Sequence, residues 1–248
     1  MARLDGKVAV VTGASKGIGA GIARALARDG AAVVVNYASS RAGAEAVVEA
    51  IVADGGRAVA VQGDVTKADQ AHGLMNAAVE RFGRLDVLVN NSGLYEFALI
   101  EDVTEDLYRR LFDVNVLGTL LATQAAAKHL GRGGSVINIS SAATDVLAPT
   151  MAVYTGTKGA VNAITAVLAV ELAPRGIRVN AVSPGYVVTE GTRTAGITGS
   201  EMEAGLVAQT PLGRAGQPDD IARVVAFLAS EDAGWVTGEV VKASGGIR

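Results

Sequence analysis

The chain has 248 residues, of which 50% are hydrophobic but only 4% are aromatic. Its 22 Lys and Arg against 25 Asp and Glu give a net charge of -3, which argues against the basic surface that nucleic-acid binding needs. The chain has no cysteine, which excludes disulfides, a thiolate nucleophile and a Cys-ligated metal, and its two histidines, His72 and His129, lie far apart and suggest no metal site.

Length and hydropathy favour a single domain over residues 1–248. The first seven residues lack the apolar core of a secretory signal. No apolar run reaches the ~20 residues that span a bilayer. We therefore expect a cytoplasmic protein with no membrane partner.

Short apolar runs alternate along the chain with amphipathic stretches of helical length. Most of these runs are β-branched and continuously apolar, as in strands buried on both faces of a parallel sheet. Strands are predicted at Lys7–Thr12, Ala32–Asn36, Ala58–Gln62, Asp86–Asn90, Ser135–Ser140, Arg178–Ser183 and Glu239–Ala243, and helices at 18–29, 41–54, 67–82, 104–130, 152–173 and 218–229. This alternation predicts an α/β fold, a single-domain doubly wound parallel seven-stranded sheet (Rossmann fold) with helices on both faces.

One long segment departs from this rhythm. Residues 189–200 are rich in Gly and Thr and are predicted to be irregular, and 201–209 are predicted to form a short helix. Inside a compact domain such an insertion is more often a lid than a boundary. The sequence therefore predicts a substrate lid near residues 189–210.

A glycine-rich turn follows the first predicted strand and opens the first predicted helix. Gly13 permits a tight turn, Gly17 lets the backbone approach a pyrophosphate, and Gly19 allows the helix to pack closely on the strand. The helix N-terminus then offers free N–H groups and a positive dipole end to phosphate charge. This turn predicts a dinucleotide site.

The same turn, Thr-Gly-Ala-Ser-Lys-Gly-Ile-Gly over residues 12–19, resembles the Thr-Gly-x-x-x-Gly-Ile-Gly signature of the short-chain dehydrogenase/reductase family. Other marks of that family follow in order over essentially the whole chain: Asp64-Val65, Asn90-Asn91-Ser92-Gly93, Asn115, Ser141, Tyr154-x-x-x-Lys158 and Pro184-Gly185. Within the family the chain resembles 3-oxoacyl-acyl-carrier-protein reductases and broad NADPH-dependent ketone reductases.

Charge at the end of the second predicted strand favours NADP(H) over NAD(H). No carboxylate stands there to bind the ribose hydroxyls and repel a 2′-phosphate, whereas Lys16 and Arg41 can supply positive charge. The family resemblance implies that Asp64 and Val65 lie at the adenine, and that Val187 and Thr189 lie at the nicotinamide. The residues predicted to bind NADP(H) are Gly13, Ser15, Lys16, Gly17, Ile18, Gly19, Asn36, Tyr37, Ser39, Arg41, Asp64, Val65, Asn91, Ser92, Gly93, Tyr154, Lys158, Pro184, Gly185, Val187 and Thr189.

Tyr154 and Lys158 stand four residues apart at the start of a predicted helix, which places them on one face. A phenol with a pKa near ~10 is a poor acid or base at neutral pH. We expect the nearby ammonium to lower the pKa of the phenol towards useful proton transfer.

Two further polar residues are predicted to act with this pair. Ser141 follows the fifth predicted strand, at the sheet edge where open α/β sheets bind ligands, and a mid-helix Asn115 calls for a special reason. The family resemblance implies that Ser141 orients the substrate carbonyl and that Asn115 holds a relay water, with Tyr154 as acid/base and Lys158 as anchor of the ribose. Ser140 is a rival for the role of Ser141, and strand alternation allows only one of them to face the site.

These residues predict reduction of a ketone to a secondary alcohol by NADPH. Reduction of 3-oxoacyl groups on acyl carrier protein is one alternative, with Arg132 and Arg175 at the positions that face the carrier in that subgroup. An NAD(P)+-dependent alcohol or sugar dehydrogenase shares every catalytic residue and is a second alternative. A nucleotide-binding regulator without turnover is a remote third, since such a protein needs no proton relay.

The chain departs from the family pattern at two places. Ser92 stands where alanine is more usual, and Lys242-Ala243-Ser244-Gly245-Gly246 stands where many relatives have Val-Asp-Gly-Gly.

The predicted helices 104–130 and 152–173 are more apolar than one sheet contact requires. The family resemblance makes them the dimer faces of a homotetramer.

Overall fold

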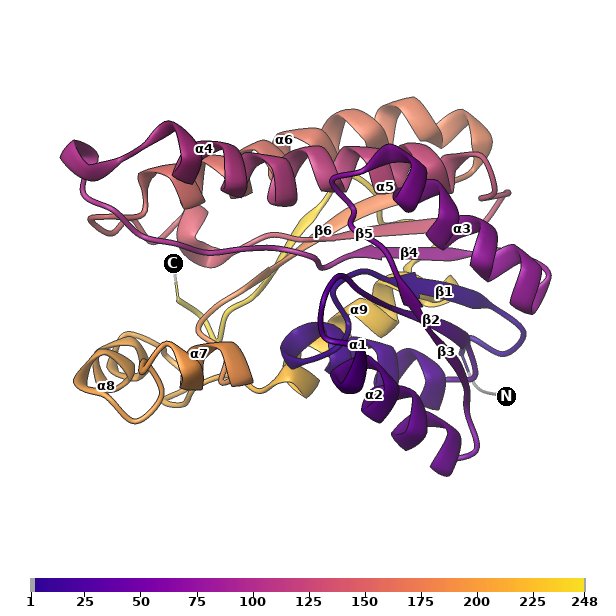
Figure 1. The fold of residues 1–248 in the computed structure, drawn as a ribbon, viewed down its shortest axis with the longest axis horizontal. Helices are drawn as coiled ribbons and strands as arrows, with labels where there is room; N and C mark the ends of the chain where they lie inside the picture. The colour runs from indigo at the N-terminus through magenta and orange to yellow at the C-terminus, as the bar shows by residue number, and fades with distance from the viewer. Residues whose placement is uncertain (1–2, 248) are drawn as a thin grey trace.

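Seven parallel strands form one sheet between two layers of helices in the computed structural model, which describes residues 3–247 (Figure 1). The strands are β1 (Val8–Val11), β2 (Ala32–Tyr37), β3 (Arg57–Gln62), β4 (Val87–Asn90), β5 (Ser135–Ile139), β6 (Arg178–Pro184) and β7 (Val240–Ala243), in the order β3-β2-β1-β4-β5-β6-β7. The order reverses between β1 and β4, which is the switch point where such sheets bind ligands. The predicted doubly wound fold is confirmed.

The central strands are buried on both faces, which explains why the sequence shows them as continuous apolar runs. In β1, Ala9 and Val11 belong to one core cluster, whereas Val8 and Val10 belong to the other. This alternation follows from the two-residue period of a strand. Val10 pairs in register with Val34 of β2 on one side and with Leu88 of β4 on the other.

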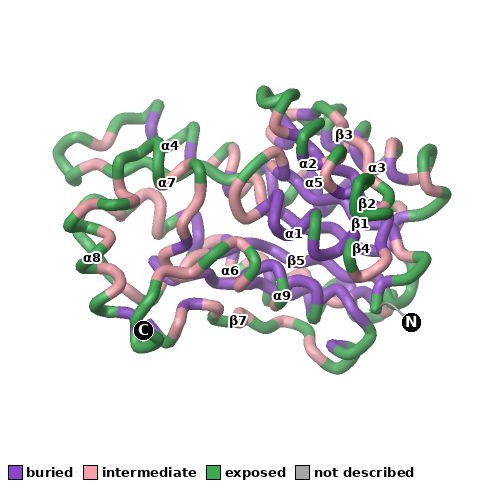
Figure 2. The backbone as a smooth tube through the Cα atoms, turned by 90° about the horizontal axis from the view of Figure 1, so that it is seen from below, coloured by how far each residue is buried: buried purple, intermediate pink, exposed green. Residues whose placement is uncertain are grey.

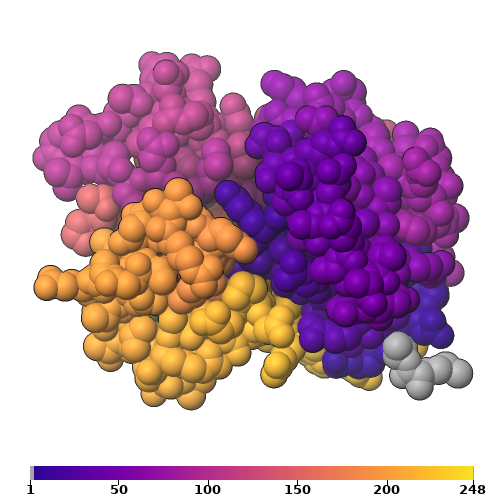
Figure 3. All heavy atoms as spheres, turned by 60° about the horizontal axis from the view of Figure 1, so that its bottom comes forward, coloured from indigo at the N-terminus to yellow at the C-terminus, as the bar shows by residue number. Residues whose placement is uncertain are grey.

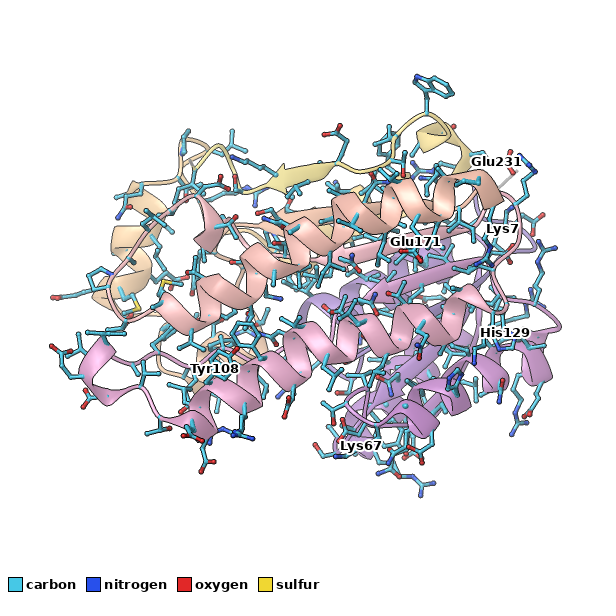
Figure 4. The ribbon with its side chains drawn as sticks, turned by 90° about the horizontal axis from the view of Figure 1, so that it is seen from above. Lys7, Lys67, Tyr108, His129, Glu171 and Glu231 are labelled. Carbon is cyan, nitrogen blue, oxygen red and sulfur yellow. The ribbon has the colours of Figure 1, made fainter. Side chains whose placement is uncertain are left out.

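Two groups of helices cover the two faces. The first group packs with Ala9 and Val11 and the second with Val8 and Val10. Figure 4 shows the α4–α5 run and α6 side by side over the sheet, with Tyr108 labelled on one and Glu171 on the other. The first group is α1 (Gly17–Arg28), α2 (Arg41–Ala53) and α9 (Pro218–Ala229), and the second is α3 (Ala68–Phe82), α5 (Gly118–Ala127) and α6 (Ala152–Leu172). Helix α4 (Glu105–Phe112) precedes α5 and lies against α6.

The single helix predicted over 104–130 is interrupted in the structure. Residues Asp113–Leu117 form a π-helical turn between α4 and α5, in which the Gly118 amide donates to the Asp113 carbonyl. The wider turn carries Asn115, whose side chain binds the loop after β4. Single π-helical turns inside α-helices are frequent at functional sites.

The segment 189–200, predicted to be irregular, contains the short helix α7 (Glu190–Thr194). Thr189 and Thr192 cap it reciprocally, with N···O distances of 3.2 and 2.9 Å. This pair was missed because the partner of the cap residue is usually Glu or Gln rather than Thr. The next predicted helix is present as α8 (Glu201–Ala208).

Burial separates the sheet from the α7–α8 segment. Figure 2 shows β1, β4 and β5 mostly in the buried colour, whereas α8 is coloured as exposed or intermediate. The protein therefore has a rigid core and a lightly packed segment beside the carboxyl ends of the strands. Within residues 3–247, no helix combines the length and apolarity needed to cross a membrane.

Candidate active site

The predicted catalytic residues lie together at the carboxyl edge of the sheet. Ser141 follows β5 directly, Tyr154 and Lys158 lie in the first two turns of α6, and Asn115 lies in the π-helical turn. Figure 3 shows the surface hollowed between the magenta residues after β4, the orange α7–α8 segment and the indigo turn before α1. Ligands of open parallel sheets bind at this edge.

The Tyr154 phenol is held in its protonated form. Burial raises its pKa above the ordinary value of 10.0, the hydrogen bond with Ser141 opposes that increase, and Tyr95 adds to it. Loss of hydration penalises the charged phenolate more than one hydrogen bond recovers. The phenol is therefore suited to donate a proton at neutral pH.

Lys158 does not lower the pKa of Tyr154 in this structure, contrary to the sequence-based expectation. Its Nζ donates to the Ile139 carbonyl at 2.8 Å and lies 5.9 Å from the centre of the Tyr154 ring. The lysine side chain is buried, and burial lowers its own pKa from 10.5 to about 8. The ammonium therefore lies near the phenol, but it donates its hydrogen bond to the backbone carbonyl at the end of β5.

Asn115 joins the loop after β4 to α6. Its Oδ1 accepts from the Leu94 amide at 2.8 Å, and its Nδ2 donates to the Leu94 carbonyl at 2.9 Å and to Thr157 Oγ1 at 3.0 Å. Thr157 in turn donates to the Tyr154 carbonyl at 2.7 Å. The side chain of Asn115 thus fixes the position of Tyr154, while its role in a water relay stays a prediction.

Thr157 also belongs to this arrangement, although the sequence did not predict it. It is fully buried and bridges two predicted catalytic residues, Asn115 and Tyr154. The only sequence signal is a hydroxyl residue directly before Lys158, and that signal is too common to identify it. Its importance comes from the contact with Asn115, 42 residues earlier in the chain.

The two serines at the end of β5 have different surroundings. Ser140 is buried, and its hydroxyl donates to Asn162 Oδ1 at 2.6 Å. The Ser140 hydroxyl proton is therefore already hydrogen-bonded within the protein. Ser141 is half-buried; its Oγ accepts from the Ala143 amide at 3.2 Å and bonds Tyr154. This geometry favours Ser141 as the residue that meets a substrate.

The glycine-rich turn has the close packing that a dinucleotide cradle needs. Gly13 and Gly17 have φ of 59° and 57°, a conformation that favours glycine. A Cβ on Gly19 would lie 2.6 Å from the Gly13 carbonyl oxygen. The start of α1 has no side-chain cap, and the Gly17 amide donates to the Glu190 carboxylate at 2.9 Å. An anion thus already binds where phosphate charge is predicted.

The residues predicted around the 2′-phosphate fall into two sets. Lys16 and Ser39 are exposed, as is Arg41, whose Nε donates to Glu45 at 2.8 Å. Asn36 and Tyr37 are buried. The side-chain amide of Asn36 accepts from Gly13 N at 3.0 Å and donates to Gly63 O at 2.9 Å, so it holds the backbone of the glycine-rich turn in place.

Other predicted cofactor residues surround the same turn. Asn91 donates from Nδ2 to the Thr12 and Gly13 carbonyls at 2.9 and 3.0 Å, and Ser92 N donates to Thr12 Oγ1 at 3.0 Å. Gly93 lies beside Lys158 and Asn115. Asp64 accepts from Thr66, Val65 packs against Gly118, Ser15 lies against Gly43, and Ile18 packs on the core.

The loop after β6 lies between the cradle and the lid. Gly185 packs against Ser244, and Val187 is buried. Thr189 lies next to Gly17, and its hydroxyl caps the N-terminus of α7. Pro184, the last residue of β6, fixes the start of this loop. Residues 3–247 contain no group of three or more His, Cys, Asp or Glu placed to hold a metal ion.

Comparisons with known proteins match nearly the whole length of the chain. The family model described as enoyl-(acyl carrier protein) reductase matches residues 13–248. The chain is 79% identical over 248 residues to an uncharacterized oxidoreductase of Methylorubrum extorquens, covering 100% of both. It is similar to a short-chain dehydrogenase/reductase from Serratia marcescens (TM-score 0.93, 39% identity, 99% of each chain). It is also similar to the angucycline C-6 ketoreductase LanV with bound NADP (TM-score 0.93, 38% identity, 99% and 96% of the chains).

Proposed function

The chain belongs to the short-chain dehydrogenase/reductase family, and we propose that it is an NADPH-dependent ketone reductase with Tyr154 as its proton donor. Membership makes it an NAD(P)-dependent oxidoreductase that acts on carbonyl or hydroxyl groups. We propose, beyond this, the direction of the reaction, the choice of NADPH and the roles of the individual residues.

The state of Tyr154 carries the proposal. A phenol whose pKa lies above 10 keeps its proton at neutral pH and can deliver it to a developing alkoxide. The reverse oxidation needs the phenolate as a base, and that form is scarce below pH ~10. Near pH 7 the protonated phenol therefore supports proton delivery to a carbonyl oxygen.

The neighbouring residues have separate tasks in this mechanism. Ser141 donates to the substrate oxygen beside Tyr154, which polarises the carbonyl and stabilises the negative charge that develops there. Lys158 would hold the ribose of a bound nicotinamide cofactor and would return a proton to the Tyr154 phenolate. Asn115, through Thr157, keeps Tyr154 in register with the loop after β4.

The cradle fits a dinucleotide. Its closely packed glycines leave no room for a Cβ at Gly19, and the uncapped start of α1 attracts an anion. Bound NADPH would supply the hydride, and the protein would position it and exclude water. Gly13, Ser15, Gly17, Ile18, Asn91, Ser92, Gly93, Pro184, Gly185, Val187 and Thr189 would hold the cofactor, with Asp64 and Val65 at the adenine.

Free positive charge supports NADPH over NADH. Lys16 is exposed beside the cradle, and Arg41 can leave Glu45 because exposed i,i+4 pairs are weak, at about 0.3–0.5 kcal/mol. A 2′-phosphate offers both cations a stronger, charge-assisted partner. Exchange of Arg41 to Ala should weaken NADPH binding without affecting NADH. Exchange of Arg109, an exposed arginine paired with Glu105 on α4, serves as the matched control.

Residues 189–210 are proposed to act as a lid. The segment is lightly packed, and a hydrogen bond from Gly17 to Glu190 holds it against the glycine turn. Phosphate charge at the same helix end would compete with the Glu190 carboxylate. Movement of the lid is therefore coupled to binding of the cofactor.

An acyl-carrier-protein substrate is a weaker alternative. Arg132 and Arg175 lie at the amino ends of β5 and β6, on the opposite sheet edge from Tyr154. Arg175 donates to the Ala127 and Leu130 carbonyls at the end of α5, which gives it a structural role. Within one chain, these arginines cannot guide a carrier-bound substrate to Tyr154.

Assembly into a homotetramer remains part of the proposal. Leu120 of α5 and Val167 and Val170 of α6 are exposed on neighbouring helices. An exposed apolar surface formed by adjacent helices marks an interaction site. Light scattering should give a mass well above the monomer value of 25.1 kDa.

One set of rate measurements tests the activity. NADPH and NADH consumption is followed at neutral pH with an aryl ketone, a 3-oxoacyl thioester and an enoyl thioester. We expect NADPH-dependent reduction of the ketone, its loss in Tyr154→Phe, and its retention in Tyr108→Phe, the control on α4. Reduction of the enoyl thioester alone would contradict carbonyl reduction, and NADPH binding without any turnover would favour the nucleotide-binding regulator.

A further inference from the structure

Aromatic side chains gather around the candidate catalytic hydroxyl in a chain that is only 4% aromatic. The Tyr95 and Phe97 rings stack with centres 6.0 Å apart and planes at 29°. Phe97 meets Tyr154 edge to face at 6.2 Å and 90°. Tyr186 lies near Tyr95 and raises its pKa, after the larger effect of burial. Four of the chain's few aromatic residues therefore share this one edge of the sheet.

The Tyr95 and Phe97 rings are not part of the core. Their exposed fractions are 42% and 44%, although both lie beside Tyr154. Aromatic faces left in water at a reactive group are costly unless a ligand covers them. We call this stacked pair, Tyr95 with Phe97, the aromatic platform.

The backbone holds the aromatic platform rigidly. Leu94 is bonded through its amide and its carbonyl to Asn115, and Ala98 N donates to Thr150 O at 2.9 Å. Between them, Glu96 pairs with Arg110 at 2.9 Å. Leu94 and Ala98 are thus held through their backbone and Glu96 through its side chain, whereas the side chains of Tyr95 and Phe97 stay exposed.

The lid side is fitted to the same rings. A Cβ on Gly191 would lie 3.0 Å from the Tyr95 hydroxyl, so glycine leaves the space that this tyrosine fills. The Tyr186 hydroxyl is bonded to Thr198 and Glu203 at 3.1 and 3.2 Å, which fixes its ring to the lid. Tyr95 and Tyr186 are therefore both in contact with the lid segment.

We propose that the aromatic platform selects planar aromatic ketones, with a ring of the substrate stacked on Tyr95 and Phe97 while its carbonyl oxygen meets Tyr154 and Ser141. This inference rests on the proposed function. The reaction balances as ketone + NADPH + H+ to secondary alcohol + NADP+. Bound NADPH would supply the hydride to the carbonyl carbon, Tyr154 would supply the proton to the oxygen, and the Tyr154 phenolate would regain a proton through Lys158. The flat face of an aromatic ring gains attraction from stacking that a puckered aliphatic ring of equal size lacks.

Two ketones with the same carbon skeleton test the proposal: 1-tetralone, which has an aromatic ring, and 1-decalone, which is saturated. Phe97→Leu keeps an apolar side chain but removes the stacking face. We expect it to lower kcat/KM for 1-tetralone by about 2- to 12-fold, mainly through KM, and to change that for 1-decalone by less than twofold. Tyr95→Leu should act in the same way, while Tyr95→Phe should be silent. Phe227→Leu, a change on the remote α9, is the control.

Equal losses for both ketones, or no loss for either, in the two leucine variants would overturn the platform. A second measurement does not depend on turnover. Calorimetric titration of the NADP+-loaded protein should show tighter binding of 1-naphthol than of decahydro-1-naphthol, and Phe97→Leu should abolish that preference. If the wild type reduces neither ketone but prefers 1-naphthol, the proposed reductase function fails while the aromatic platform stands; equal binding of the two alcohols overturns the platform.

Discussion

Lys158 holds a positive charge where the fold makes it costly, and this predicts an unusual dependence of stability on pH. The side chain is 6% exposed, and its Nζ donates to a neutral carbonyl, that of Ile139. Within residues 3–247 it makes no salt bridge. A pKa lowered from 10.5 to about 8 corresponds to a cost of about 3 kcal/mol for the charged form in the folded state.

The sign follows from proton binding. Between about pH 8 and pH 10.5 the unfolded chain keeps the lysine proton while the folded protein has released it. Stability rises with pH wherever the unfolded state binds more protons. The free energy of unfolding of the wild type, minus that of Lys158→Met, should therefore increase by about 2–3 kcal/mol from pH 7 to pH 10.

Urea unfolding followed by far-ultraviolet circular dichroism measures this difference, with both proteins at one fixed concentration. Fluorescence is a poor probe because Trp235, the only tryptophan, is fully exposed. Subtracting the variant cancels the other titrating groups, and Lys67→Met, on the surface before α3, controls for loss of one charge. A difference that stays flat across this range would refute the cost assigned to the buried ammonium, and a decrease would show that the sign is wrong.

Three further predictions concern activity and the cofactor. Ser141→Ala should lower kcat/KM for a ketone about 10²- to 10³-fold without changing the Kd of NADPH, and equal losses in both would point to damage to the fold. Reduction should decline as pH rises through about 8, where Lys158 loses its charge; a rate that stays level to pH 10 would contradict this role. Gly19→Ala should lower stability and NADPH affinity, because its Cβ would meet the Gly13 carbonyl, whereas Gly73→Ala on α3 has open space and should stabilise by about 0.5–1 kcal/mol. Unchanged NADPH affinity in Gly19→Ala would remove the packing argument for the cradle.

The sequence predicted the sheet well because its signal is local and strong. The seven predicted strands differ from the observed ones by one residue at each end or less, and the core strands are recognisable as uninterrupted apolar runs. The interruption near Asn115 was not predictable in the same way. At this turn the Asn115 side chain makes two hydrogen bonds to Leu94, 21 residues earlier, and no periodic pattern reports such a contact.

The candidate site shows the same division. The order of Ser141, Tyr154 and Lys158 along the chain was enough to expect one cluster, and the structure brings them together. The inward-facing Asn36 amide, the bridge through Thr157 and the contact of Glu190 with the glycine turn were not predicted. Each joins residues that are 23 to 173 positions apart.

The sequence by itself determined the fold class and the family resemblance, and it predicted the catalytic set, because periodicity and motif spacing are properties of neighbouring residues. Only the tertiary structure decided the protonation of Tyr154. Charge reasoning along the chain expected Lys158 to lower that pKa, whereas burial raises it, since the cost of losing water depends on every segment packed around the phenol. The aromatic platform likewise meets Tyr154 only in the tertiary structure, because Phe97 and Tyr154 lie on segments that are far apart in the chain.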